Sequence, residues 1–160
     1  MKQIWAPWRM DYILGEKPRE CIFCHSIRTK HSKKKLILYQ GDFSLVMLNK
    51  YPYTNCHLLI APRRHTDTLD NLTKEESLDI FYTLRKSLSV LKESVKPDGF
   101  NIGMNLGRIA GAGAEDHIHF HIVPRWCGDT NFMPILAESM VIPEHLEKAY
   151  DRLIPFFKKL

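Results

Sequence analysis

Short apolar runs bounded by turn-forming residues recur along the chain between residues 36 and 125. This spacing is typical of short β-strands. The pattern predicts five strands, at residues 36–39, 43–48, 56–61, 100–106 and 117–125. Because the tight turn Gln40-Gly41-Asp42 joins the first two strands, we expect a hairpin and an antiparallel sheet.

A helical period interrupts the strands after residue 73. Thr73 and Glu76 form a capping-box motif, which marks the start of a helix. Apolar residues then recur every three or four positions and predict one buried stripe, formed by Leu78, Phe81, Leu84, Leu88, Leu91 and Val95. Pro143 precedes a second helical period, whose predicted buried face consists of Leu146, Tyr150, Leu153 and Phe157. Together the elements predict an α+β domain, with an antiparallel sheet of about five strands, one long inserted helix and a C-terminal helix.

The length of 160 residues is that of a single domain. We expect an N-terminal arm at residues 1–20, a core at 21–125 and a C-terminal extension with its helix at 126–160. No apolar run resembles a signal peptide or a membrane span, so we expect no membrane association. Four cysteines without a secretion signal favour a reducing compartment, and we expect the cytoplasm. The net charge of +5 suits an anionic ligand.

The motif richest in chemistry is His117-Ile118-His119-Phe120-His121. Alternate side chains of a strand share a face, so the three imidazoles should line one face and the apolar side chains the other. Imidazoles bind metals, carry protons and act as nucleophiles, and when protonated they attract phosphate. A glycine-containing loop at residues 107–115 leads directly into this strand. We therefore expect the functional site here.

Cys21 and Cys24 form a CxxC pair at the start of the core. Two thiolates at this spacing make half of a tetrahedral zinc site, which needs two further ligands. Thioredoxin-like redox use is the alternative, although no βαβ pattern follows the pair. His25, next to Cys24, is a competing candidate ligand.

Taken in order, these motifs resemble the histidine triad (HIT) superfamily of nucleotide hydrolases and transferases. The likeness covers nearly the whole chain and includes Asn49, the run at residues 57–62, His65 and Asn105. WAPWR at residues 5–9, PRW at 124–126 and GDTNFMP at 128–134 are similar to the bacterial branch associated with diadenosine tetraphosphate phosphorylase. The resemblance implies a HIT-like fold, an adenine dinucleoside polyphosphate as substrate and a homodimer, with Trp5, Trp8 and the C-terminal helix as candidate contacts.

The resemblance also implies catalytic roles for three histidines. His119 would attack the α-phosphorus of the substrate and form a covalent nucleotidyl-histidine. His121 and His57 would hydrogen-bond the phosphate oxygens around the scissile bond. The alternative for His57 is a core histidine whose hydrogen bonds are satisfied within the fold.

Five residues are implied to bind the substrate. Asn105 and the amides of the loop with Gly111 and Gly113 would cradle the phosphates. Asn49 would hold the ribose hydroxyls, and Met47 would lie beside the base. The alternative for both asparagines is the capping of turns.

In zinc-bearing members of the family, the CxxC pair is joined by two histidines, which here are His65 and His117. The resemblance therefore implies a structural zinc site with the ligands Cys21, Cys24, His65 and His117. A catalytic zinc held by all three triad histidines is disfavoured, since their positions on one straight strand spread over roughly 13 Å. Magnesium could accompany the substrate, although no carboxylate cluster indicates a site for it.

The sequence departs from the common family pattern in three places. Cys56 stands where a glycine often precedes His57, and Gly113-Ala114 stands where many members carry Gln-Ser near the leaving group. The triad ends in His121, whereas several nucleotidyltransferase branches carry glutamine. That last difference favours hydrolysis, while the branch resemblance favours transfer to phosphate.

Three functions follow as hypotheses. The first is cleavage of dinucleoside polyphosphates, above all diadenosine tetraphosphate, by nucleotidyl transfer to phosphate or water. The second is hydrolysis of nucleoside phosphoramidates or adenylyl conjugates by the same mechanism. The third is a zinc-stabilised nucleic-acid-binding module, favoured by the pI of about 9.0. We expect no nucleic-acid partner, because the Cys and His spacing does not fit a short zinc finger.

Overall fold

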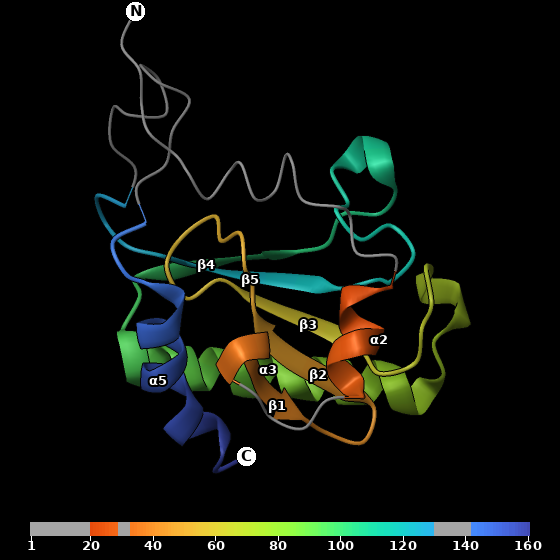
Figure 1. Ribbon diagram of the computed structural model, residues 1–160, viewed down its shortest axis with the longest axis horizontal. Coiled ribbons are helices and arrows are strands. Elements are labelled where there is room, and N and C mark those ends of the chain that lie inside the picture. The colour runs from red at the N-terminus through yellow and green to blue at the C-terminus, as the bar shows by residue number, and fades with distance from the viewer. Residues whose placement is uncertain (1–19, 29–32, 130–141) are drawn as a thin grey trace, which may run out of the picture.

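The computed structural model describes residues 20–28, 33–129 and 142–160. Within them an antiparallel five-stranded sheet has the strand order β1-β2-β3-β5-β4 (Figure 1). The strands are β1 (Ile37–Gln40), β2 (Ser44–Leu48), β3 (Leu58–Pro62), β4 (Gly99–Gly103) and β5 (Phe120–Arg125). The predicted hairpin is the β1–β2 pair, and the predicted α+β fold is confirmed. β4 lies at one edge of the sheet.

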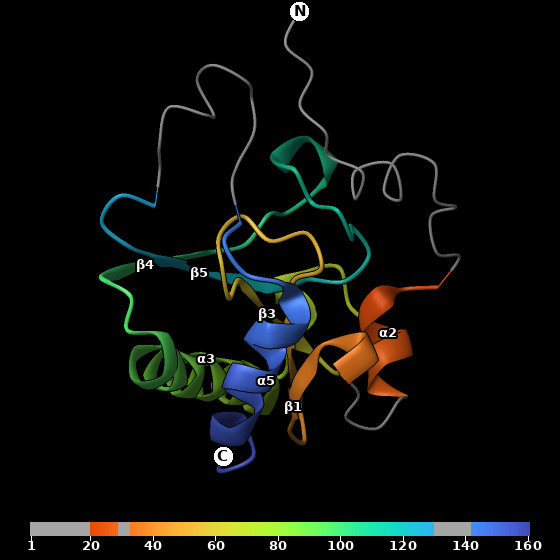
Figure 2. The same cartoon turned by 60° about the vertical axis from the view of Figure 1, so that its left-hand side comes forward.

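Helices cover both faces of the sheet. The long helix α3 (Lys74–Val95) runs along one face, and α5 (Leu146–Phe157) packs against α3 and β1. The short helix α2 (Ile22–Ile27) lies on the opposite side of the sheet from α3 (Figure 2). Short 3-10 turns occupy three connections: η1 (Lys33–Lys35), η2 (Leu69–Asn71) and η3 (Arg108–Ala110). No helix among the described residues combines the length and the apolar character needed to cross a bilayer.

The capping box predicted at the start of α3 is present. The Thr73 hydroxyl accepts a hydrogen bond from the Glu76 amide, and the Glu76 carboxylate accepts one from the Thr73 amide. Glu76 also receives two hydrogen bonds from the Arg64 guanidinium, at 2.8 and 2.7 Å. The helix start is thereby tied to the segment that follows β3.

The buried face of α3 differs from the predicted stripe. Leu78 and Phe81 are 63% and 64% exposed. The face toward the sheet instead carries small residues, and the Thr83 hydroxyl lies 2.9 Å from that of Ser44 on β2. Since small side chains let a helix approach the sheet closely, packing rotates the buried stripe onto Ile80, Thr83, Leu84, Ser87, Val90 and Leu91. The face predicted for α5 is confirmed at Tyr150, Leu153 and Phe157.

The histidine strand is shorter than predicted, because β5 begins at Phe120. The Ile118 amide donates to the Thr66 carbonyl rather than to a neighbouring strand, at 2.8 Å. The His117 ring is held by the Pro62 carbonyl at the end of β3. Only His121 of the three histidines therefore lies in the regular strand.

Two parts of the predicted organisation lie outside the described residues. They are nearly all of the N-terminal arm, with Trp5 and Trp8, and residues 130–141 of the C-terminal extension. The division into arm, core and extension stays a prediction.

Candidate functional site

Two cysteines and two histidines meet beside α2. Their ligand atoms, on Cys21, Cys24, His65 and His117, all lie within 4.8 Å of one another. The Cys21 Sγ–His117 Nδ1 and Cys24 Sγ–His65 Nδ1 distances are both 3.3 Å, and Cys24 Sγ–His117 Nδ1 is 3.7 Å. Ligand atoms of a tetrahedral zinc ion are separated by about 3.3–3.8 Å. The donor set and its spacing therefore fit a closed tetrahedral metal site.

The orientation of the His117 ring supports this interpretation. Its Nε2 lies 2.8 Å from the Pro62 carbonyl oxygen and must donate to it. Nδ1 is then unprotonated and directs its lone pair at the two thiols, as a metal ligand requires. His25 lies outside the cluster, with its Nδ1 3.4 Å from a Glu20 carboxylate oxygen.

His119 presents the opposite nitrogen. Its Nδ1 lies 2.9 Å from the backbone carbonyl oxygen of His117 and must donate to it. Nε2 therefore carries the lone pair, so the ring is a neutral imidazole with a nucleophilic nitrogen. The Phe23 ring of α2 packs against the rings of His117 and His119, and its centroid lies 5.0 Å from the centroid of each.

His57 and His121 form a hydrogen-bonded pair. The Tyr53 amide donates to His57 Nδ1 at 3.0 Å, so His57 Nε2 carries the proton. That Nε2 lies 2.9 Å from His121 Nδ1, which must accept. The proton of His121 is consequently on Nε2, a buried atom with no partner among the described residues. An unpaired buried donor is costly unless a ligand accepts from it, and phosphate oxygens are suitable acceptors.

Burial keeps these rings neutral. It lowers the pKa of His57 to about 3, with further lowering by His121 and His119. Burial, and then His119, lower the pKa of His121 to about 4. The pKa of His119 is also lowered by burial, while its hydrogen bond to the His117 carbonyl acts in the opposite direction. At neutral pH the site therefore offers one lone pair and one N–H donor on adjacent rings, whose centroids are 4.9 Å apart.

The residues predicted to bind substrate are placed around this site to different degrees. Met47 is buried in the apolar cluster on the α2 side of the sheet. Asn49 directs its amide at His57 Nδ1, 3.3 Å away, and its oxygen accepts from the Tyr51 amide. It caps a turn and contacts a histidine in this structure, as the turn-capping alternative expects, and its contact with a ribose stays a prediction.

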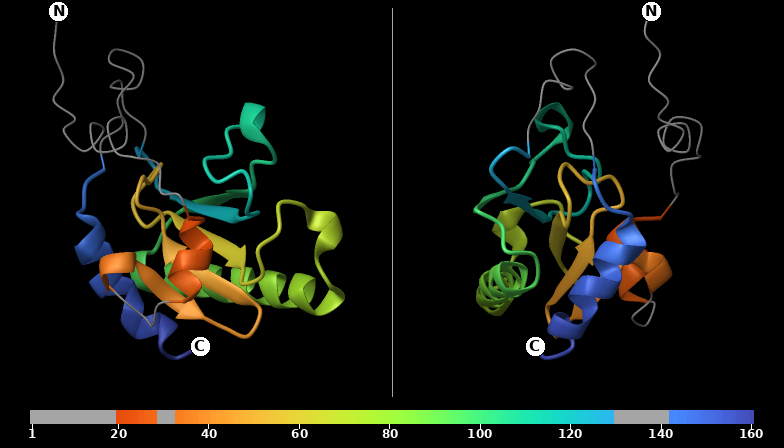
Figure 3. Two further views of the ribbon diagram at one scale, coloured as in Figure 1. Left: turned by 45° about the vertical axis from the view of Figure 1, so that its right-hand side comes forward. Right: turned by 90° about the vertical axis from the view of Figure 1, so that its left-hand side faces the viewer.

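The loop before the triad stands above the β5 end of the sheet (Figure 3). Asn105 donates to the Gly111 carbonyl at 3.3 Å and closes the loop. Gly111 has a φ of +89°, which favours glycine. The position of Gly113 does not require glycine, because its φ is not in the left-handed region and an added Cβ would meet nothing within 4 Å.

Cys56 has a left-handed backbone conformation. Its φ is +57°, a region that side-chain-bearing residues rarely occupy. The thiol is buried, and burial raises its pKa to about 12. Cys56 is therefore a packed, unreactive thiol at a strained position next to His57.

Sequence reasoning missed Tyr53. Its ring lies 4.6 Å from the His57 ring and 5.7 Å from the His121 ring, nearly parallel to the latter at 15°. An aromatic residue in a turn carries no periodic signal. The only available sign was its position four residues before His57.

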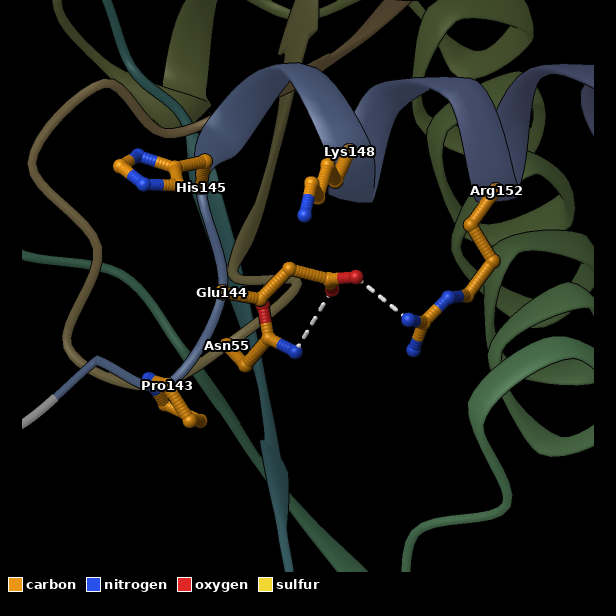
Figure 4. A pocket seen from close by; sticks show the side chains of 6 residues that line it. All are labelled: Asn55, Pro143, Glu144, His145, Lys148 and Arg152. Carbon is orange, nitrogen blue, oxygen red and sulfur yellow. Dashed lines mark hydrogen bonds and ion pairs between the residues drawn. The ribbon is translucent and has the colours of Figure 1, made fainter.

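A separate surface pocket of about 340 Å³ lies at the start of α5 and contains none of the predicted site residues. In its centre the Glu144 carboxylate accepts hydrogen bonds from Asn55 and Arg152 (Figure 4). This contact fastens the loop before His57 to the C-terminal helix.

An antiparallel sheet with the alternating histidines His117, His119 and His121 around the start of β5 is typical of a histidine triad protein. Sequence comparison agrees, since the HIT domain profile matches residues 30–127. The chain belongs to the HIT family.

Two relatives with a named activity and one solved structure are similar to this chain. The AP-4-A phosphorylase of Mycobacterium tuberculosis is 37% identical over 155 residues, which cover 91% of this chain and 79% of that protein. The adenosine 5'-monophosphoramidase of Candida albicans is 36% identical, over 66% of this chain and 70% of that one. Among solved structures, a Zn-bound histidine triad family protein from Mycobacterium smegmatis aligns with a TM-score of 0.69 and 26% identity, over 87% of this chain and 94% of that one.

Proposed function

We propose that the chain is a nucleotidyl-transferring enzyme that cleaves dinucleoside polyphosphates, above all diadenosine tetraphosphate. The observation that carries the proposal is the pairing of a lone pair on His119 Nε2 with an unpartnered N–H on His121 Nε2. A nucleophile and a phosphate donor on adjacent rings suit attack at a phosphorus atom. Similarity to the mycobacterial phosphorylase supports the choice of substrate.

In the first step His119 Nε2 attacks the α-phosphorus, and the bond from that phosphorus to the bridging oxygen breaks. The leaving nucleotide departs with the bonding electrons, and a nucleotidyl-His119 remains. His121 donates its Nε2 proton as a hydrogen bond to a phosphate oxygen where charge develops. In the second step an acceptor oxygen attacks the same phosphorus and releases His119. We propose that this acceptor is phosphate, as in the mycobacterial relative.

Product analysis tests this function. Diadenosine tetraphosphate should yield ADP and ATP only when phosphate is present, whereas a hydrolase forms AMP and ATP, or two ADP, without phosphate. His119→Ala should abolish turnover and leave the fold intact. More than about a hundredth of wild-type turnover in that variant, or a trapped label on another residue, would contradict the covalent mechanism.

A second activity, hydrolysis of nucleoside phosphoramidates, has a specific observation in its favour. The triad ends in His121 rather than glutamine, and a relative is an adenosine 5'-monophosphoramidase. His119 Nε2 would attack the phosphorus of an adenosine phosphoramidate, the P–N bond would break, and the amine would leave with the bonding electrons and take up a proton from solvent. Water would then attack the phosphorus of nucleotidyl-His119, lose a proton and release AMP. Release of AMP from that substrate without phosphate distinguishes the two activities.

We further propose zinc as the ion of the Cys21, Cys24, His65 and His117 cluster, in a structural role. Two thiolates and two imidazoles are a preferred zinc donor set, and a zinc-bound relative has the same fold. Elemental analysis should find about one zinc per chain. Magnesium finds no support, because the one cluster among the described residues able to hold an ion contains no carboxylate.

A cytoplasmic location stays a prediction.

The chain is also proposed to form a homodimer. β4 is an edge strand whose Asn101, Ile102 and Gly103 are exposed, and α3 exposes Leu78 and Phe81. An exposed edge strand is suited to pairing with a second copy, and exposed apolar side chains favour contact with a partner. Sedimentation should show a dimer, and Ile102→Lys should shift it toward the monomer.

A further inference from the structure

The Tyr53 ring covers a hydrogen bond that the proposed chemistry needs. The ring contacts both partners of the His57–His121 pair. The backbone amide of Tyr53 also donates a hydrogen bond to His57 Nδ1. One residue thus fixes the tautomer of the first ring through its backbone and shields both rings through its side chain.

The loop that carries Tyr53 is fastened just beyond it. The Thr54 hydroxyl donates to the Pro124 carbonyl of β5 at 2.8 Å. Asn55 donates to the Glu144 carboxylate, which Arg152 of α5 also contacts (Figure 4). Because Thr54 is bound to β5, and Asn55 is bound through Glu144 to Arg152 of α5, the backbone of the loop is held next to the histidines.

The position of the Tyr53 ring matters because His121 must use both of its ring nitrogens in hydrogen bonds. Its Nδ1 must accept from His57 so that its Nε2–H is available for phosphate. Water reaching Nδ1 would offer an alternative donor, and the ring could then rotate or exchange tautomers. A ring stacked on the pair excludes that water. Tyr53 is 47% exposed, so its ring reaches solvent on one side and contacts the histidine pair on the other.

We propose that Tyr53 is a positioning residue, whose ring keeps His57 and His121 in the single tautomer that leaves the His121 Nε2–H free for a substrate phosphate. The catalytic consequence rests on the proposed function, whereas the effect on the histidine rings does not. The tyrosine hydroxyl has no part in this role. Phenylalanine should therefore replace it, and alanine should not.

The protonation of the pair should respond as well. Among the described residues, His121 and His119 act on His57, His119 acts on His121, and each of these groups disfavours a positive charge. Removing the ring lets water stabilise the protonated form. The pKa of the pair should then move upward by about one unit, toward the ordinary value for histidine.

The test combines nitrogen NMR of the histidines with steady-state kinetics on the full chain. Tyr53→Ala is compared with Tyr53→Phe, Tyr53→Leu and wild type. Tyr51→Ala is the matched control, because it removes a 42% exposed tyrosine ring of the same loop that lies against Lys50. NMR of the resting protein reports the tautomer and titration of His57 and His121. Kinetics with diadenosine tetraphosphate separates kcat from KM.

Tyr53→Ala should show mixed tautomers, an upward shift in titration and a kcat lower by about tenfold, with KM changed less than about twofold. Tyr53→Phe and Tyr51→Ala should match wild type, and Tyr53→Leu should lie between. Unchanged tautomers and titration in Tyr53→Ala would overturn the inference, and so would loss of kcat in Tyr53→Phe. Should Tyr53→Ala fail to fold, Tyr53→Leu with wild-type tautomers would overturn it equally. Altered NMR signals in a protein without nucleotide turnover would refute the proposed function alone.

Discussion

Acidification should destabilise this protein through the His57–His121 pair. Both rings are neutral in the folded state, with pKa values of about 3 and about 4. In the unfolded chain each titrates near 6.5. Between pH 6.5 and 4 the unfolded chain therefore binds more protons than the folded one, so the free energy of unfolding falls as the pH falls. This stability is fully present above about pH 6.5.

The magnitude follows from the difference in bound protons. Each fully shifted histidine contributes a slope of about 1.4 kcal/mol per pH unit. From pH 7 to pH 5 two independent rings would lose about 4 kcal/mol. Because the rings share one hydrogen bond and influence each other, we expect a loss of about 2–4 kcal/mol. That is a large part of the 5–15 kcal/mol typical of a domain.

Urea unfolding at pH 7 and pH 5, followed by circular dichroism, measures this loss. Metal binding by the Cys–His cluster also depends on pH, so a variant must separate the two sources. The double variant His57→Gln/His121→Gln removes the titrating rings and keeps the cluster. Its loss between the two pH values should be smaller than that of wild type by about 2–4 kcal/mol. An equal loss in both proteins would refute the assignment of the acid sensitivity to this pair.

Two further predictions concern the metal cluster and the fold. Cys24→Ser should reduce bound zinc and lower the melting temperature, because the binding energy of a structural metal is folding energy; unchanged zinc content and melting temperature would contradict the ligand assignment. Thr73→Ala should lower the free energy of unfolding by about 0.5–2 kcal/mol, because it removes the acceptor at the start of α3. An unchanged urea midpoint would show that the cap contributes nothing.

Local signals in the sequence predicted much of the fold. The capping box at Thr73 and Glu76 is a contact between residues three positions apart, so its motif contains the whole interaction. Strands bounded by tight turns are equally local. The buried stripe of α3 is not, since the contact between Thr83 and Ser44 depends on how the helix docks on the sheet. A period of three or four alone favours the larger apolar residues, which include the exposed Leu78 and Phe81.

Part of the candidate site could likewise be predicted from the sequence, and part of it could not. Residue identity and order led to the Cys–His cluster, whose four members come together as expected from the family resemblance. The protonated nitrogens of His117 and His57 could not be predicted, because backbone groups that are distant or irregular set them. The Pro62 carbonyl that fixes His117 is 55 residues away in sequence. The Tyr53 amide that fixes His57 belongs to a turn without periodicity.

His117 joins the cluster to the proposed nucleophile through a single residue. Its ring supplies Nδ1 to the cluster, and its carbonyl oxygen accepts a hydrogen bond from the His119 Nδ1–H. The carbonyl thereby determines that the lone pair of His119 is on Nε2. A shift of the His117 backbone after loss of a metal would weaken that hydrogen bond and free the His119 ring to exchange tautomers. A metal ion that does not contact the substrate would then still affect the tautomer of the nucleophile, because His117 contacts both the cluster and His119.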